Sequence, residues 1–379
     1  MSGTLRSRRE LLEAVGALSV TLALGCGVRT VSPAVRPIDR ARPRRRLARV
    51  LVSAERIIRT DVGFRPFRPS GFLVRAETLG DKLLVHNYGH GGGGVTLSWG
   101  TADLAVEQVA SSGRSGPAAV LGCGAVGLAT ARLLQSRGFD VTIYARDLPP
   151  DTTSNLAGAS WYPFLVVDEA LRTPAFNAQF ERAARFSHRY FQGLVGDHYG
   201  VLWREQYFLS NAPAEAAWEY TLLRDLFPEP HELHPSEHPF AARHVLVDNM
   251  MFIEPPVYLT ALLRDFQLAG GCVRVQSFAQ PAQVAALREP IVVNCTGLGA
   301  RELFGDRELM PVKGQLTVLL PQPEVDYAMV TDEDLYMFPR RDGILLGGTH
   351  EHGVETREPN PDAERRILGG HRAIFDAMR

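Results

Sequence analysis

The chain has 379 residues and an ordinary composition for a globular protein, with 45% hydrophobic and 22% charged residues, and this length allows two domains and a sizeable core. The formal net charge of −1 argues against nucleic acid as the main partner. The four scattered cysteines form no C-x-x-C pair, so they support neither a disulfide framework nor a zinc site.

Residues 1–49 are predicted to lie outside the folded part of the chain. Residues 7–12, SRRELL, form a twin-arginine pattern, and the apolar stretch at 11–25 is too short to span a membrane comfortably. We expect a Tat export signal followed by a Pro- and Arg-rich linker. The Tat export machinery is then a partner, and the protein is periplasmic, extracellular or in the cell envelope. A cytoplasmic extension is the alternative, and lipidation of Cys26 is left open.

The folded part begins near Val50, and its first candidate binding residues are arginines. Arg65-Pro66 and Arg68-Pro69 are X-Pro steps, which force extended backbone and hold both arginines on a stiff segment. A planar guanidinium on rigid backbone suits a carboxylate ligand. The alternative is a pair of surface arginines.

Four consecutive glycines, Gly91–Gly94, follow a predicted strand at 83–86 and precede a predicted helix at 96–109. A glycine loop between a strand and a helix brings backbone N–H groups close to a ring or a phosphate. A flexible linker is the weaker interpretation, because apolar segments flank the loop. His86 and His90 are predicted to be hydrogen-bonded structural residues, because no third ligand is spaced to complete a metal site.

Residues 118–144 have the pattern of a β-turn-α-β unit that binds a dinucleotide. An apolar run at 118–121 predicts a buried strand, and G-x-G-x-x-G follows at Gly122, Gly124 and Gly127. These glycines allow a tight turn, close approach of a pyrophosphate and packing of helix on strand. A second strand is predicted at 141–144. The residues predicted to share one face of the intervening helix are Val126, Ala129, Leu133 and Leu134. The motif alone leaves open whether FAD or NAD binds.

The remaining residues alternate helical and extended patterns. The predicted helices are 175–191 and 257–268, and the predicted strands are 244–253, several short ones in 271–296, 312–320 and 343–347. This mixture predicts an α/β protein in which a second domain of strands and helices accompanies the nucleotide-binding domain.

Four stretches resemble the FAD-dependent D-amino-acid oxidases and D-aspartate oxidases. They are GCGAVG with ARDLPP and AGASWYPF at 122–164, IVVNCTG at 291–297, LYMFP with GILLGG at 335–348, and GFRPFRPSG with HNYGHGGGGVTLSWG at 63–100. In that family the last pair closes the chain, whereas here it comes first. The order resembles a circular permutation in which residues 111–117 join the family's original ends. Each motif occurs once, which excludes a duplication.

The resemblance implies an α/β fold with a FAD-binding Rossmann-like domain and a mixed, largely antiparallel substrate domain in permuted chain order. The chain then passes between the two domains several times. After the export signal and linker at 1–49, the implied segments are a permuted FAD- and substrate-binding part at 50–111, the Rossmann unit at 112–164, the substrate domain at 165–256, the FAD-binding domain at 257–315 and the substrate domain at 316–379.

The resemblance also implies roles for individual residues. Arg65 would clamp the substrate carboxylate, Tyr336 would hydrogen-bond it, and the backbone at Gly92 and Gly93 would meet the substrate amine and the flavin. The implied FAD contacts are Gly122, Gly124, Ala125, Val126, Gly127, Arg146, Asp147, Thr152, Thr153, Gly158, Ala159, Ser160, Val275, Gly297, Gly91, Gly94, Val95 and Thr96. Arg146 and Asp147 lie about 20 residues beyond the glycines, the spacing of an acidic ribose partner.

The implied reaction is the oxidative deamination of D-amino acids, in which a hydride passes from Cα to flavin N5, the imino acid leaves, and O2 becomes H2O2. Asp332 departs from the family, which carries a second active-site tyrosine there. An aspartate would repel an acidic side chain, so neutral or basic substrates are predicted; the alternative is that Asp332 faces solvent. A related flavoprotein dehydrogenase or amine oxidase and a non-catalytic nucleotide-binding protein are the other interpretations, and a homodimer is left open.

Overall fold

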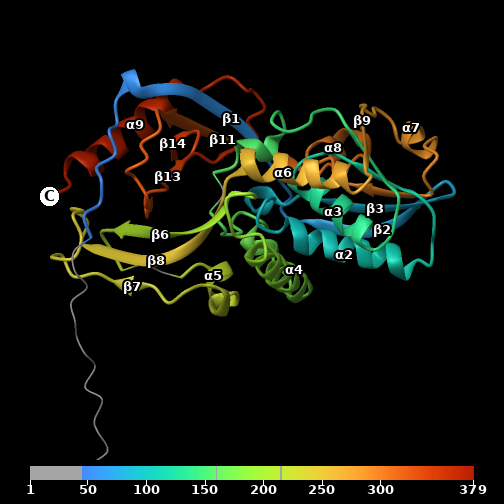
Figure 1. Cartoon of the computed structure of the whole chain (residues 1–379), viewed down its shortest axis with the longest axis horizontal. Helices are drawn as coiled ribbons and strands as arrows, with labels where there is room; N and C mark the ends of the chain where they lie inside the picture. Colours follow the sequence, from blue (N-terminus) through green and yellow to red (C-terminus); the bar gives the residue numbers. More distant parts are fainter. Residues whose placement is uncertain (1–44, 159, 214–215) are drawn as a thin grey trace, which may run out of the picture. The chain divides into compact units, whose positions relative to one another are not determined.

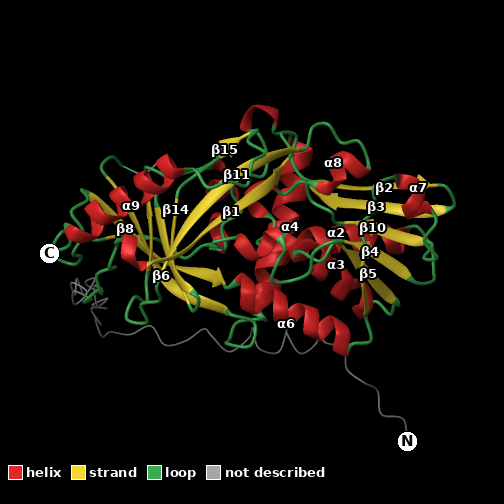
Figure 2. Cartoon of the chain, turned by 90° about the horizontal axis from the view of Figure 1, so that it is seen from above, coloured by secondary structure: helices red, strands yellow, loops and turns green. Residues whose placement is uncertain are grey.

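The computed structural model describes residues 45–158, 160–213 and 216–379. The predicted export signal, Cys26 and the predicted flavin contact Ala159 lie outside the described residues. Within the described ranges, no helix combines the length and apolar character that a membrane span requires. Two β-sheets with helices packed against them make up the described chain (Figures 1 and 2).

The smaller sheet carries the glycine motif. Within the described residues it has six strands in the order β2-β3-β10-β4-β5-β9. Their bounds are β2 (Leu73–Leu79), β3 (Lys82–Tyr88), β4 (Ala118–Leu121), β5 (Val141–Ala145), β9 (Cys272–Val275) and β10 (Ile291–Asn294). β2 is antiparallel to β3, and all other neighbours are parallel. The central strands β4 and β10 are buried throughout, because helices cover both faces of a parallel sheet.

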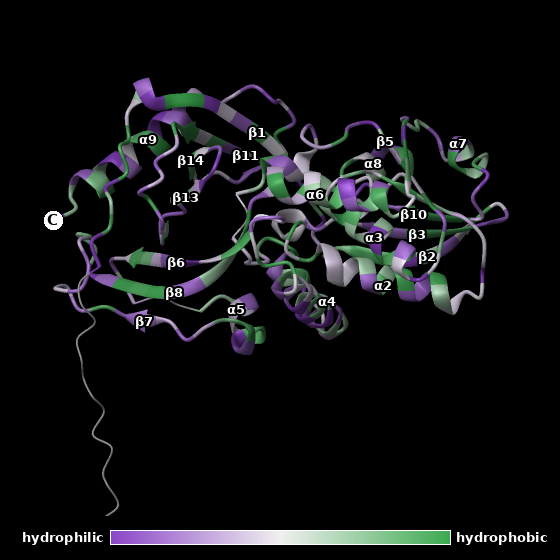
Figure 3. Ribbon diagram, in the orientation of Figure 1, coloured by the Kyte–Doolittle hydropathy of each residue, from purple (hydrophilic) through white to green (hydrophobic). Residues whose placement is uncertain are grey.

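Helices cover the two faces of this sheet. One face packs against α2 (Ser98–Ser111), α3 (Ala125–Ser136) and α6 (Pro255–Leu268), and the other against α7 (Pro281–Ala285) and α8 (Gly299–Leu303). Alternate residues of β4 serve the two cores, since Val120 packs with the first group and Leu121 with the second. α4 (Pro174–Gln192) packs on α2 and is amphipathic, and Figure 3 shows purple and green alternating along its ribbon.

The larger sheet follows the order β1-β11-β14-β13-β12-β6-β8-β7 within the described residues, with β15 beside β11. Its strands are β1 (Ile57–Phe67), β6 (Val201–Ser210), β7 (His231–Glu232), β8 (His244–Ile253), β11 (Met310–Leu319), β12 (Ala328–Thr331), β13 (Tyr336–Arg340), β14 (Gly343–Gly347) and β15 (Glu351–His352). The neighbours are antiparallel except β12 and β6. A short helix, α5 (Trp218–Leu222), lies between β6 and β7 in the chain.

The two faces of the larger sheet belong to different cores. α9 (Pro361–Asp376) packs on one face and buries Ile367 and Phe375 against Met337 and Leu346. The opposite face, represented by Phe338, packs in the core that also holds α2 and α3. Side chains on this second face therefore meet the segments that leave the smaller sheet.

The first and last described segments of the chain lie together. Arg49 Nη2 donates to the Met378 carbonyl at 2.8 Å, and the Tyr327 hydroxyl donates to the Ala48 carbonyl at 2.8 Å. Arg372 Nε donates to the Val52 carbonyl at 3.2 Å. α9 thus ends beside the segment that leads into β1, whereas α2 is connected to β4 by residues 112–117, which are almost entirely exposed.

The predicted elements lie close to the observed ones, and β4 and β14 have the predicted bounds. The predicted face of α3 is wrong in part, since Val126 and Leu133 are half-buried whereas Leu128 is fully buried. The reason is that Gly127 faces the turn after β4, so the side of α3 that carries Gly127, Ala131 and Leu134 is the buried one. The 50–111 segment also divides, because β1 joins the larger sheet while β2, β3 and α2 join the smaller one.

Candidate active site

The glycine motif forms a tight turn between β4 and α3. Gly122 has a φ of +109°, and a Cβ there would lie 2.5 Å from the Cys295 carbonyl oxygen; a Cβ at Gly127 would lie 2.1 Å from the Gly122 carbonyl oxygen. Both positions exclude a side chain. Gly124 is the N-cap of α3 and supplies no capping side chain. The helix N-terminus therefore presents main-chain N–H groups and a positive dipole end to a phosphate.

Neighbouring strands bring further predicted contacts to the same edge of the sheet. Arg146 and Asp147 follow β5, which pairs with β4, and their side chains form an ion pair at 2.7 Å. Val275 ends β9 opposite Ala145. Gly297 follows β10 with a φ of +56°, and a Cβ there would lie 3.9 Å from Pro66 Cγ. Ligands of parallel sheets bind beyond the carboxyl ends of the strands, which is where these residues gather.

Residues 152–160 connect this edge with the larger sheet. Thr152 is buried and its hydroxyl donates to Asn155 Oδ1 at 2.7 Å, whereas Thr153 is exposed. Ser154 Oγ accepts from the N–H of Ala125, the first residue of α3, at 3.0 Å. At the far end, the Ser160 hydroxyl lies 3.4 Å from Gln206 Oε1 on β6. The segment thus runs from the glycine turn to the strands of the larger sheet.

The four-glycine loop is packed tightly against residues 164–166. The Gly92 N–H donates to the Leu165 carbonyl at 3.2 Å, and the Gly93 N–H donates to the His90 carbonyl at 2.9 Å. A Cβ at Gly91 would lie 1.9 Å from the Leu165 carbonyl oxygen, whereas the nearest atom to a Cβ at Gly94 would be 3.8 Å away. The buried residues that follow are Val95 and Thr96. The contacts of this loop with substrate and flavin stay a prediction.

The two histidines that precede the loop are hydrogen-bonded, as the sequence predicts. His86 lies 3.1 Å from both Glu77 Oε1 and Asn294 Nδ2, and His90 Nε2 lies 2.9 Å from Thr101 Oγ1. Burial lowers the pKa of both imidazoles, that of His90 to about 3. Among the residues that the structure describes, no group of three or more His, Cys, Asp or Glu side chains could hold a metal ion.

Arg65 stands on β1 and lies over a glycine of the next strand. A Cβ at Gly314, on β11, would lie 2.6 Å from Arg65 Nη1. Nη1 donates to the Thr349 carbonyl at 3.1 Å, and the guanidinium carbon lies 5.7 Å from the centre of the Phe164 ring. Within the described chain no carboxylate pairs with this half-buried cation. An unpaired, partly desolvated guanidinium is a binding group for an anionic ligand.

Tyr336 stands on β13 and approaches the Arg65 guanidinium from the other side of β11 and β14. It pairs with Gly347 on β14, and a Cβ at Gly347 would lie 2.0 Å from Tyr336 Cζ. Burial raises the pKa of the Tyr336 phenol, and the charge and hydrogen bond of the Arg65 guanidinium oppose this shift. Because the strand order is β1-β11-β14-β13, the two side chains converge over glycines of the two middle strands. They form a set of donors for one carboxylate.

Tyr336 and its neighbour Phe338 contact Gly158, which belongs to the segment predicted to contact the flavin. A Cβ at Gly158 would lie 3.5 Å from Tyr336 Cε2 and 3.1 Å from Phe338 Cδ2. Gly297 lies beside Pro66, the residue after Arg65, since an added Cβ at Gly297 would lie 3.9 Å from Pro66 Cγ. The structure therefore brings the predicted carboxylate clamp and the predicted nucleotide contacts together, although Arg65 and Tyr336 lie far apart in the sequence.

The sequence interpretation missed Gly314, Gly347 and His350. A glycine inside a strand marks close approach of another group, so the glycines in VKGQL and ILLGG carried a usable signal. The His350 ring stands edge-on to Phe164, with centroids 5.7 Å apart, and its buried Nε2 has no hydrogen-bond partner among the described residues. Burial and the Arg65 charge lower the pKa of His350 to about 4, so the ring is neutral at pH 7.

Asp332 lies on the turn between β12 and β13 and is exposed. Its carboxylate accepts from the Asn211 N–H at 3.2 Å. Asp334, with a φ of +63°, is the acid whose charge acts on Tyr336 and His350, and its Oδ2 lies 3.8 Å from His350 Nδ1. The structure thus favours the alternative in which Asp332 faces solvent.

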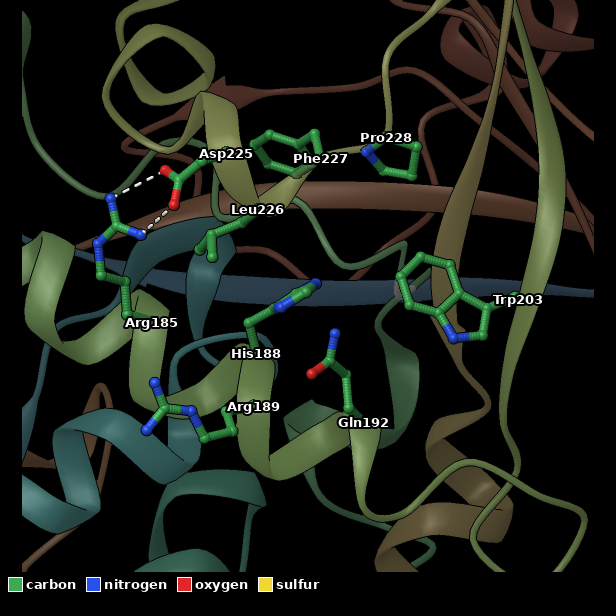
Figure 4. A pocket seen from close by; sticks show the side chains of 9 residues that line it. All are labelled: Arg185, His188, Arg189, Gln192, Trp203, Asp225, Leu226, Phe227 and Pro228. Atoms are coloured by element: carbon green, nitrogen blue, oxygen red, sulfur yellow. Dashed lines mark hydrogen bonds and ion pairs between the residues drawn. The ribbon is translucent and has the colours of Figure 1, made fainter. Parts of the chain in front are cut away.

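A separate surface hollow of about 420 Å³ lies between α4, β6 and residues 225–228 (Figure 4). Arg185 donates to both carboxylate oxygens of Asp225 on its rim, at 2.6 and 2.9 Å. The other lining residues are His188, Arg189, Gln192, Trp203, Leu226, Phe227 and Pro228. None of the predicted site residues lines this hollow.

These features define a dinucleotide-binding protein with a carboxylate clamp beside the nucleotide edge. The close approaches at Gly122 and Gly127, the glycine N-cap of α3 and the acid after β5 all fit FAD. The chain belongs to the FAD-dependent oxidoreductase family, whose model matches residues 16–108 and 118–378.

Individual relatives agree with this assignment. A D-amino-acid oxidase of Rubrobacter xylanophilus is 31% identical over 269 residues, covering 69% of this chain and 78% of that protein. A D-amino-acid oxidase of Dictyostelium discoideum is 30% identical over 267 residues, covering 65% and 69%. The structure of glycine oxidase from Bacillus cereus shares the fold, with a TM-score of 0.51 and 16% identity over 69% of this chain and 79% of that one. The predicted family, the α/β fold class and the FAD cofactor are confirmed, whereas the permuted chain order stays a prediction.

Proposed function

We propose that this protein oxidises D-amino acids to imino acids, with FAD as cofactor and O2 as the electron acceptor. The observation that carries the proposal is the convergence of Arg65 and Tyr336 over Gly314 and Gly347, beside the nucleotide edge. An amino-acid oxidase needs such a clamp, whereas a protein that only binds a nucleotide does not. The names of the relatives support the D configuration of the substrate.

Arg65 and Tyr336 bind the substrate carboxylate and so orient Cα, and orientation supplies much of the barrier reduction in such a reaction. Gly122, Gly124, Gly127 and Asp147 would hold FAD, which supplies the acceptor for the hydride that leaves Cα. Phe338 is buried and Phe164 is half-buried, so the clamp lies beside apolar surface that excludes water and strengthens its ion pair. The neutral His350 Nε2 can accept a hydrogen bond from a donor on the substrate.

We further propose that neutral or basic D-amino acids are preferred. This preference is supported by Asp334 rather than by Asp332, because the charge of Asp334 acts on Tyr336 and His350, which lie around Arg65. An acidic substrate side chain directed towards Asp334 would be repelled. Steady-state kinetics with D-aspartate, D-alanine and D-lysine test the proposal, and a clear preference for D-aspartate would refute it.

The decisive test of function is the visible absorption spectrum of the purified protein, recorded without oxygen before and after addition of D-alanine and then L-alanine. Bleaching of a flavin spectrum by D-alanine alone supports D-amino-acid oxidation. If neither D-alanine nor L-alanine bleaches the flavin spectrum, the protein is instead a related amine oxidase or dehydrogenase. Oxygen consumption compared with dye reduction then identifies the electron acceptor.

Two arginines of one segment give a matched pair of variants. Arg68 forms ion pairs with Asp306 at 3.1 Å and with Glu308 at 2.6 Å, so its role is structural. Arg65→Ala should lower kcat/KM by roughly 100-fold or more while FAD stays bound, because a desolvated charge pair is worth about 3 kcal/mol. Arg68→Ala should lower the melting temperature and leave kcat/KM nearly unchanged. Equal kcat/KM in the two variants would contradict the assignment.

We also propose that the chain is a circular permutant of the family order. The contacts of Arg49 with Met378 and of Arg372 with Val52 support a former connection from α9 to β1. A rearranged chain, with residue 379 joined to residue 47 by a short Gly/Ser linker and new ends between 112 and 117, should fold and bind FAD. A control with new ends inside the β4–α3 turn should not. The proposal fails if both rearranged chains lack FAD.

Export by the Tat pathway is proposed from the SRRELL pattern. Replacing Arg8 and Arg9 by lysine should keep the protein in the cytoplasm, because the signal is recognised by a receptor. Fractionation of cells expressing the two forms measures this, and equal export of both forms would contradict it.

A further inference from the structure

α9 lies behind the strands that carry the substrate clamp, on the opposite face of the larger sheet (Figure 2). It makes polar contacts with three of the segments around the site. The Thr60 hydroxyl on β1 donates to Glu364 at 2.9 Å, and Arg366 donates to the Gly348 carbonyl. The third contact joins His371 to Tyr336 itself.

His371 is fully buried, and both of its ring nitrogens face carbonyl oxygens. Nδ1 lies 2.7 Å from the Ile367 carbonyl oxygen and Nε2 lies 3.1 Å from the Tyr336 carbonyl oxygen. The ring stacks on Phe375, with centroids 6.4 Å apart. Burial lowers the pKa of His371 to about 4; the charge of Arg366 acts in the same direction, while the two carbonyls oppose it. The ring is therefore neutral at pH 7 and has one proton to donate.

Either the Ile367 carbonyl or the Tyr336 carbonyl receives this proton. In an α-helix the Ile367 carbonyl already accepts the main-chain N–H four residues later, that of His371 itself. We propose that His371 is a positioning residue, which donates Nε2–H to the Tyr336 main chain and so fixes the phenol over Gly347. The proposal rests on the proposed role of Tyr336 in carboxylate binding.

The geometry around Tyr336 makes its position sensitive to this bond. The phenol ring fills the space that a Cβ at Gly347 would occupy, and it shares a carboxylate with Arg65 in the proposed site. Leu335, the residue before Tyr336, packs closely on Gly370 of α9, where an added Cβ would lie 2.5 Å from Leu335 Cδ1. α9 therefore supports the start of β13 at two successive residues, once by packing and once by a hydrogen bond.

Two substitutions separate the hydrogen bond from the rest of the side chain. His371→Gln places an amide N–H where Nε2 stands, whereas His371→Asn reaches only the position of Nδ1. His371→Asn should raise KM for D-alanine about tenfold with kcat within about twofold, the loss expected for one buried hydrogen bond. His371→Gln should restore KM to within about twofold of the natural chain. In a Tyr336→Phe background, His371→Asn should cause little further loss, because both act through one phenol.

A ¹⁹F NMR measurement that does not depend on catalysis completes the test. With 3-fluorotyrosine incorporated, the ¹⁹F resonance of Tyr336, assigned from its absence in Tyr336→Phe, should shift in His371→Asn and stay in place in His371→Gln. Phe375→Leu controls for loosening of α9, and it should lower the melting temperature without moving this resonance. If His371→Asn does not fold, His371→Phe replaces it, since an aromatic ring keeps the stacking on Phe375.

The outcomes separate the two proposals. If the natural chain does not oxidise D-amino acids, the proposed function fails, and the resonance alone decides the role of His371. Equal KM values for the Gln and Asn variants, additive losses with Tyr336→Phe, or a Tyr336 resonance that Phe375→Leu moves as far as His371→Asn would each overturn the positioning role.

Discussion

Gly314→Ala should disable the substrate clamp without removing a charged or polar group. The added Cβ would lie 2.6 Å from Nη1, 2.8 Å from Nη2 and 2.9 Å from Cζ of Arg65. All three atoms belong to the end of a flexible side chain, so the guanidinium moves and the backbone stays. Contact at an ordinary carbon separation requires a shift of about 1 Å. A misplacement of that size at a reacting site costs about 100-fold in rate.

The assay is kcat/KM for D-alanine, measured with bound FAD and melting temperature in the same preparation. We expect kcat/KM to fall about 100-fold, near 2.7 kcal/mol of transition-state binding, while FAD content stays at that of the natural chain. Gly369→Ala is the matched control, because a Cβ there meets nothing within 4 Å. It should leave kcat/KM unchanged and stabilise α9 by about 0.5–1 kcal/mol. Unchanged kcat/KM in Gly314→Ala would refute the placement of Arg65 over the glycine.

Three further outcomes follow from the same structure. Gly127→Ala should cost about 1–3 kcal/mol of stability and most of the bound FAD, measured as flavin absorbance per protein, because its Cβ would lie 2.1 Å from backbone at Gly122. Tyr336→Phe should raise KM for D-alanine about tenfold with FAD retained, through loss of one hydrogen bond; an unchanged KM would remove Tyr336 from the site. Stability should fall as the pH drops below 6.5, because the pKa values of buried His90 and His371 lie at about 3 and 4 and the unfolded chain takes up protons first. Each histidine contributes about 1.4 kcal/mol of this loss of stability per pH unit, down to its folded pKa. Urea unfolding midpoints between pH 8 and pH 5 measure the loss. A midpoint that does not change with pH would contradict it.

The nucleotide unit could be predicted from the sequence because its contacts are local. Gly122 and Gly127 touch each other and the end of β10, and β4 and β5 are joined by a single helix. The orientation of α3 was harder to predict, since hydrophobic periodicity counts apolar residues whereas the close approach of Gly127 decides which side faces β4.

The substrate clamp depended on the family resemblance, because no spacing connects Arg65 with Tyr336. Two strands lie between them, and only the strand order brings them together. Asp332 and Asp334 show a different limit. They lie two residues apart on one turn, and the conformation of that turn brings the Asp334 carboxylate rather than that of Asp332 to His350, a choice that composition does not reveal.

The position of β1 has a consequence for synthesis on the ribosome. Ile57 pairs with Leu319, and the hairpin of β2 and β3 pairs with β10, so these early strands emerge long before their partners exist. At about 5–20 residues per second, the roughly 250 intervening residues take about 12–50 s to make. During that interval the edges of β1 and β3 that pair with β11 and β10 stay open to wrong partners. The nascent chain should therefore depend on chaperones that shield its first 100 residues until β10 and β11 are complete.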